Sequence, residues 1–184
     1  EKDKENPFLT ESIGTITAEA NKTGLAHMMT DEGRRVAGTD LGFYHIGGIR
    51  LSNILPGDIT RGDIYNNDPF RSTIYIGEMS GEQIRNFILT KYNNGTPENP
   101  DKESHYPYFR SDIEYEIILD EKGDATDIKF ELDEDKKYRV AMGNYIAESY
   151  IDKELVSSAL YDTNISVREA MVHYVSTLSE GYTP

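Results

Sequence analysis

A strand-type segment that runs directly into a helix start lies near the middle of the sequence. Residues 72–79 alternate between polar and apolar side chains and are rich in residues that favour strands. Ser80 and Gln83 then form the two ends of a capping box, so we expect a helix from there to about Tyr92. A strand that leads straight into a helix indicates a sheet with helices packed against it.

The other predicted elements mix strands and helices without a regular alternation. A helix is expected from about Gly24 to Ala37, with Gly38 in the left-handed cap position. A second capping box, Ser166 to Glu169, opens a final helix that ends near residue 178. We further expect a short helix at 60–66 and strands at 13–17, 40–46, 113–119, 126–132 and 138–142. This irregular order predicts an α+β fold with a mixed sheet and packed helices.

Length and charge restrict the classes of function. The 184 residues fit one domain, which we place at residues 13–184, with 1–12 as a linker. The formal net charge of −14 repels polyanions, so we expect no nucleic-acid partner, although a local arginine can still hold a small nucleotide. The chain has no cysteine and no apolar run of the ~20 residues that a membrane helix requires.

Motifs for self-contained hydrolysis are missing from the sequence. Its four histidines, at positions 27, 45, 105 and 173, form no HxxxH, HxH or DxH pairing that could hold a metal. It contains neither a GxSxG elbow nor a Walker phosphate loop nor GxGxxG. We therefore expect no cofactor and no catalytic residue in this chain.

Three short segments carry candidate binding residues. Gly47 and Gly48 allow positive φ and leave space for a ligand, and Arg50 follows with a planar fork that suits phosphate or carboxylate. Phe70 precedes one predicted strand, and Tyr145 follows another. Each feature alone is also common in ordinary packing. Two rings that converge beside an arginine would form a stacking slot for a nucleobase.

Together these spacings resemble a known family. The segment GTDLGFYHIGGIRLSNILPGDITRGDIYNNDPFRSTIYIGEMSGEQIRNFI, residues 38–88, is similar to the C-terminal, substrate-binding domain of the 5'-nucleotidases. That family also includes UDP-sugar hydrolases and 2',3'-cyclic nucleotide phosphodiesterases. The resemblance continues through residues 26–35, 106–109 and 138–147, so it covers nearly the whole chain from about residue 14.

The resemblance assigns roles to individual residues. Arg50 matches the arginine that contacts the substrate phosphate or its polar neighbours, and Phe70 and Tyr145 match the two rings that sandwich the base. Gly47 and Gly48 would shape the pocket floor.

The chain also departs from the family pattern. His45 stands where many members have Asn, and Ser72 replaces the usual Asn or Gly. Asn144 keeps its place, but the Gly-Gly-Asp-Gly-Tyr segment expected after it is changed, and Asp152 is a candidate replacement for its Asp.

By the same resemblance, the parent protein would have a separate N-terminal metallophosphoesterase domain with two divalent metal ions, absent from this chain. The chain would bind a nucleotide or nucleoside beside that domain, at an extracytoplasmic or cell-wall location. The altered segment leaves an alternative open: a degenerate, non-catalytic binding or cell-surface interaction domain that keeps the fold. The substrate stays open among AMP, other 5'-nucleotides, cyclic nucleotides and nucleotide sugars.

Overall fold

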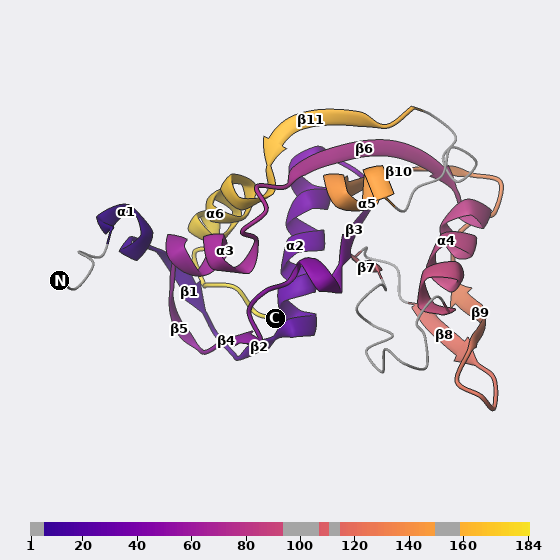
Figure 1. Cartoon of the computed structure of the whole chain (residues 1–184), viewed down its shortest axis with the longest axis horizontal. Helices are drawn as coiled ribbons and strands as arrows, with labels where there is room; N and C mark the ends of the chain where they lie inside the picture. Colours follow the sequence, from indigo (N-terminus) through magenta and orange to yellow (C-terminus); the bar gives the residue numbers. More distant parts are fainter. Residues whose placement is uncertain (1–5, 94–106, 111–114, 150–158) are drawn as a thin grey trace.

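Our computed structural model describes residues 6–93, 107–110, 115–149 and 159–184 of the chain (Figure 1). The helices in these ranges are α1 (Pro7–Thr10), α2 (Lys22–Ala37), α3 (Arg61–Asn67), α4 (Gly81–Asn93), α5 (Asn144–Ser149) and α6 (Val167–Thr177), with a 3-10 turn, η1, at Ile46–Gly48. The strands are β1 (Ser12–Ile16), β2 (Ala20–Asn21), β3 (Leu41–His45), β4 (Asn53–Ile54), β5 (Gly57–Thr60), β6 (Thr73–Ser80), β7 (Pro107–Arg110), β8 (Tyr115–Leu119), β9 (Ala125–Phe130), β10 (Lys137–Gly143) and β11 (Tyr161–Ser166).

A five-stranded mixed sheet forms the centre of the described fold, in the order β11-β6-β10-β3-β7. β10 pairs with β3 in parallel, and the other neighbours in this sheet are antiparallel. Three smaller antiparallel pairs, β1-β5, β2-β4 and β8-β9, lie outside it. The predicted α+β class with a mixed sheet is confirmed.

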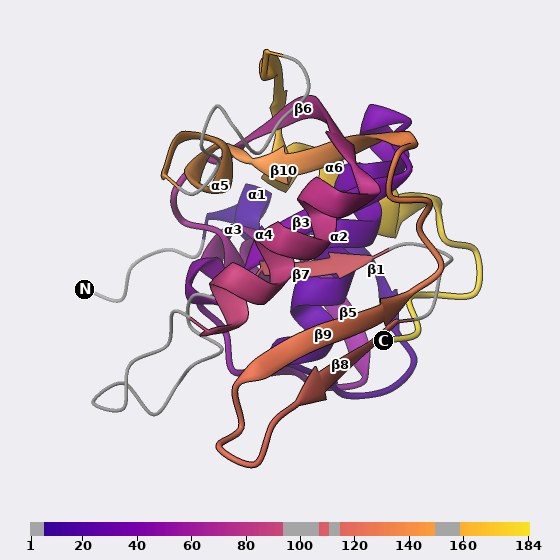
Figure 2. The same cartoon turned by 90° about the vertical axis from the view of Figure 1, so that its right-hand side faces the viewer.

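Helices cover both faces of the central sheet, as Figure 2 shows for α4 and α2. A Cβ atom on Gly42 would lie 2.2 Å from the carbonyl oxygen of Thr30, so this face of β3 touches α2 directly. The next residue, Phe43, points to the opposite face. There its ring makes an edge contact with Phe87 of α4, with the centroids 5.4 Å apart. Both rings are fully buried, which stabilises the fold by about 2–3 kcal/mol per side chain.

Backbone and side-chain caps fix the helix ends that the sequence predicts. Gly38 closes α2 at φ 60°, ψ 44°, which confirms the left-handed cap. At α4, the Ser80 N–H donates to Gln83 Oε1 and the Gln83 N–H donates to Ser80 Oγ, so the capping box is complete. At α6, Ser166 Oγ accepts the N–H of Glu169 at 3.5 Å.

Strands β2, β4 and β5 and helix α1 are elements that the sequence pattern did not predict. β2, β4 and β5 have two to four residues each, too few for a visible alternation. Within the part assigned to a linker, α1 packs on α3, where Phe8 makes an edge contact with Tyr65. The boundary at residue 12 stays a prediction. None of the helices in the described ranges has the length and apolar character needed to cross a membrane.

Candidate functional site

The sheet topology brings three strand ends to one edge. Because β3 and β10 run parallel, both end there, and antiparallel β6 begins at the same place, with Ile74 opposite Gly143. The residues that follow β3, precede β6 and follow β10 therefore gather at this edge. We call His45, Arg50, Phe70 and Tyr145 the strand-end site.

Arg50 and Phe70 contact each other in this site. The guanidinium carbon of Arg50 lies 4.8 Å from the centroid of the Phe70 ring. Both side chains are exposed, Phe70 by 55%. The segment that carries Arg50 is tied to the end of α3, because the Arg50 N–H donates to the Asn67 carbonyl at 3.1 Å and the Leu51 N–H donates to Asn67 Oδ1 at 3.3 Å.

His45 and Tyr145 form a second aromatic pair. Their ring centroids lie 4.5 Å apart at an interplanar angle of 33°. On its other side, His45 stacks with Tyr44 at 5.3 Å and 26°. Tyr145 is 46% exposed, whereas His45 is half-buried. The structure therefore places His45 against one of the two rings predicted to hold a base.

Gly47 and Gly48 lie in the 3-10 turn after β3, and their conformation corrects one sequence argument. Neither glycine has positive φ. Space is the reason for glycine at position 48, because a Cβ atom there would lie 2.7 Å from His45 Cε1 and 2.8 Å from Tyr44 Cε1. Gly48 thus makes room for the chain's own rings.

A buried aspartate, which the sequence reasoning missed, supports the Phe70 loop. Asp68 is 0% exposed, and its Oδ1 accepts hydrogen bonds from the Phe70 N–H at 3.2 Å and the Ser72 hydroxyl at 3.1 Å. Between these donors, Arg71 has the left-handed value φ 57°, which is unfavourable for a residue with a Cβ. Asp68 therefore bridges a strained turn that presents Phe70. The Asp-Pro pair before Phe70 is the turn signal that could have indicated it.

Tyr44 lies next to the loop that carries Phe70. Its hydroxyl is buried, and burial followed by the nearby charge of Asp68 raises the pKa of Tyr44 well above its usual range. The tyrosine is neutral at every physiological pH, so it fills space beside the loop and does not act as a base.

Charge is distributed unevenly around the strand-end site. Arg34, Arg61 and Arg85 each form an ion pair with a carboxylate. Arg50 and Arg71 form none with any residue that the structure describes. In a chain with 33 acidic residues, these are two exposed cations next to Phe70 in the sequence or in contact with its ring, and such cations favour an anion.

Two predicted site residues follow β10. Asn144 is half-buried at the start of α5, next to Tyr145. Asp152 lies outside the described residues, so its predicted role stays a prediction.

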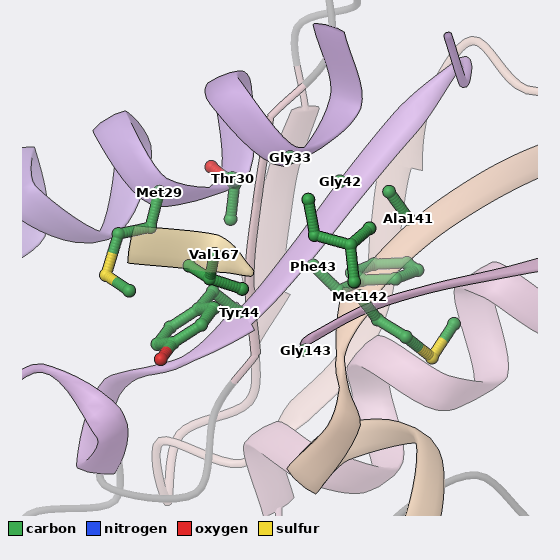
Figure 3. A pocket seen from close by; sticks show the side chains of 11 residues that line it. Met29, Thr30, Gly33, Gly42, Phe43, Tyr44, Ala141, Met142, Gly143 and Val167 are labelled. Carbon is green, nitrogen blue, oxygen red and sulfur yellow. The ribbon is translucent and has the colours of Figure 1, made fainter. Parts of the chain in front are cut away.

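A small apolar cavity between α2 and the sheet is distinct from the strand-end site. It has a volume of about 10 Å³, room for about one water molecule and far too small for a nucleoside. Figure 3 shows Met29 and Thr30 of α2 facing residues of β3 and β10 across it. Within the described ranges, no group of three or more His, Asp or Glu side chains is arranged to hold a metal ion.

A known protein family matches most of the chain. The sequence profile described as "5'-nucleotidase, C-terminal domain" matches residues 8–151. The chain belongs to this family. A curated relative of the 5'-nucleotidase C-terminal domain family, the trifunctional nucleotide phosphoesterase protein YfkN of Bacillus subtilis (strain 168), is 29% identical over 135 residues. The match covers 66% of this chain but only 9% of that protein.

Solved structures show the same 5'-nucleotidase C-terminal fold. The 5'-nucleotidase precursor from Thermus thermophilus superposes with a TM-score of 0.70 at 22% identity, over 92% of this chain and 37% of the other. The NAD nucleotidase (NadN) of Haemophilus influenzae gives 0.72 at 19% identity, over 92% and 36%. The chain thus spans little more than a third of the solved proteins that it matches.

Proposed function

We propose that this chain is the substrate-binding domain of a nucleotide-hydrolysing phosphoesterase. The strand-end site would hold the nucleotide, with Phe70 and Tyr145 against the base and Arg50 at the phosphate. Gly47 and Gly48 would form the floor, and His45, Asn144 and Asp152 would supply polar contacts.

One observation carries this proposal. In a chain of the 5'-nucleotidase C-terminal family, the topology gathers at one sheet edge two exposed aromatic residues and an arginine that forms no ion pair with any described residue. Aromatic faces stack on any base, and a guanidinium binds phosphate through two parallel hydrogen bonds. Base and phosphate are the two parts of a nucleotide, so both recognition chemistries are present together.

A separate N-terminal metallophosphoesterase domain would carry out the bond cleavage in the same proposal. Two divalent metal ions in that domain would activate water and stabilise the leaving oxygen. The residues of this chain would bind and orient the substrate, and we expect the isolated chain to be inactive. An extracytoplasmic or cell-wall location belongs to the same proposal, and cell fractionation followed by immunodetection of the chain tests it.

Binding to the isolated domain should be weak. Stacking contributes about 1–3 kcal/mol per base, so two rings and one arginine give roughly 4–7 kcal/mol before the entropy of association is subtracted. This corresponds to a dissociation constant around millimolar or weaker.

An NMR titration of the 184-residue chain with adenosine and with AMP tests the proposal. We expect saturable shifts near Phe70 and Tyr145, and Phe70→Ala should weaken binding of both ligands about tenfold, because one stacking surface is lost.

Tyr161→Ala is the matched control, since Tyr161 is 65% exposed on β11, where it lies opposite Ile76 in the interior of β6. It should leave both affinities unchanged. Absence of shifts for either ligand up to about 20 mM, well above the expected affinity, would contradict the proposal and favour a degenerate interaction domain.

A further inference from the structure

The contact between Arg50 and Phe70 has a consequence for ligand choice. The guanidinium lies over the exposed ring at 4.8 Å, on a surface that a base would use for stacking. Arg50 forms no ion pair with any described residue, so the aromatic ring is its main contact there. The cation thus occupies one face of the ring.

We propose that Arg50 covers the Phe70 ring until an anionic phosphate draws it away, so that the site selects nucleotides over nucleosides. This inference rests on the proposed function and adds a mechanism for discrimination. A nucleoside would have to displace the cation without any replacement for it. A nucleotide supplies the replacement, because its phosphate accepts the guanidinium as the base takes the ring.

The relative strengths of the two contacts support this order of events. A cation–π contact at an exposed site is weak and changes an equilibrium by a factor of about 2–5. A paired guanidinium and phosphate form a charge-assisted, two-pronged hydrogen bond, which is the stronger interaction. Arg50 is therefore held on the ring firmly enough to hinder a nucleoside and loosely enough to leave it for a phosphate.

The backbone around both residues is suited to such a movement. The Arg50 N–H is fixed to Asn67, and the Phe70 N–H is fixed to buried Asp68. The exposed Arg50 side chain can change rotamer while both main-chain segments stay in place.

Affinities of the 184-residue chain for adenosine and for AMP, measured by NMR on wild type and Arg50→Ala, test the inference. Arg50→Ala should weaken AMP binding about tenfold and tighten adenosine binding about two- to fivefold, because the cover is gone. The opposite signs for the two ligands distinguish a cover from a simple phosphate ligand.

Arg71→Ala is the control for charge. Arg71 is exposed and follows Phe70 in the sequence, and no cation–π contact joins it to an aromatic ring of the described residues. Removal of its charge should weaken AMP binding slightly and leave adenosine binding unchanged. An equal tightening of adenosine in Arg71→Ala would overturn the inference, since general electrostatics would then explain the effect.

A second measurement needs no nucleotide. In the free chain, the Arg50 side-chain protons should show an upfield ring-current shift that disappears in Phe70→Leu, and AMP should reduce this shift in wild type. Absence of the ring-current shift in the free chain overturns the inference even when both ligands bind as the proposed function expects. Unchanged or weaker adenosine binding in Arg50→Ala overturns it as well. A ring-current shift that is present while neither ligand binds contradicts both the inference and the proposed function.

Discussion

Two regions of the molecule place an arginine over an aromatic ring, but they treat its charge differently. On α2, Arg35 lies 5.5 Å from the Tyr174 ring, and buried Asp31 binds Arg34 at 2.9 Å, Arg35 at 3.1 Å and the Tyr174 hydroxyl at 3.3 Å. At the strand-end site, Arg50 lies over Phe70 and forms no ion pair with a carboxylate of the described residues. The first arrangement satisfies its charges internally and joins α2 to α6, whereas the second leaves a cation available for a ligand.

The residue next to Asp31 in the sequence, Glu32, is an acid whose charge is not matched in this way. Glu32 is 0% exposed, and neither of its carboxylate oxygens has a hydrogen-bond partner among the described residues. Burial, with a smaller contribution from the charge of Asp31, raises the pKa of Glu32 from 4.5 to about 8. The folded chain therefore keeps Glu32 protonated at neutral pH.

The largest expected effect concerns this residue. Because the folded pKa lies above the unfolded one, the stabilisation by the bound proton is complete below about pH 4.5 and is lost as the pH rises to about 8. This loss amounts to up to about 5 kcal/mol of unfolding free energy. Glu32→Gln should remove it, so urea unfolding should show the variant gaining stability over wild type as pH increases. Exposed Glu121→Gln is the control, and an identical pH profile for Glu32→Gln and wild type would contradict the expectation.

The second prediction compares the two arginine regions directly, and its expected effect is smaller. Asp31→Ala leaves two arginines without their carboxylate, one of them largely buried, and should lower the free energy of unfolding by about 3 kcal/mol. Arg50→Ala removes an exposed charge that forms no ion pair with any described residue, so it should cost less than about 0.5 kcal/mol. Urea denaturation of both variants measures the difference. Similar losses for the two would show that Arg50 also has a structural role.

The third prediction, with a smaller loss than Asp31→Ala, concerns Asp68, which supports the strand-end site. Asp68→Ala removes the acceptor of two hydrogen bonds around the strained Arg71 and should destabilise the chain by about 2 kcal/mol. The Phe70 amide should then exchange with solvent faster, as hydrogen-exchange NMR can measure. Ser72→Ala removes one of these bonds and should cost about half as much. A Phe70 amide that stays equally protected in Asp68→Ala would show that other contacts hold the loop.

Local sequence signals were sufficient for the long elements of the fold. The caps at Ser80 and Gly38 are formed by residues within a few positions, so the pattern predicted α4 and the end of α2 correctly. β2 and β4 exist only because each pairs with the other across about 30 residues, and such short strands leave no periodicity to detect. Likewise, β11 was not predicted, because its irregular pairing with β6 interrupts the alternation.

The candidate site could be predicted in part, because the spacings of its residues resemble those of a known family. Arg50 and Phe70 were proposed to lie together, and the structure brings them into contact. The ring of His45 against Tyr145 depends on the parallel pairing of β3 with β10, which no local pattern encodes. Asp68 reads as an ordinary turn residue in the sequence, and only its burial shows that it supports Phe70.

The parallel pairing at the centre of the sheet also governs how the chain reaches its native state. Asp40 and Arg139, 99 residues apart in sequence, continue that pairing: the Asp40 N–H donates to the Arg139 carbonyl, and the Arg139 N–H donates to Asp40 Oδ2. A loop of this length must close before the central strands gain any contact with each other, and contacts of large sequence separation slow folding. The helices α2 and α4 can form earlier from local interactions. We therefore expect the edge that carries Arg50, Phe70 and Tyr145 to assemble late in folding, and a refolding chain to recover its helical signal before it can recognise any ligand there.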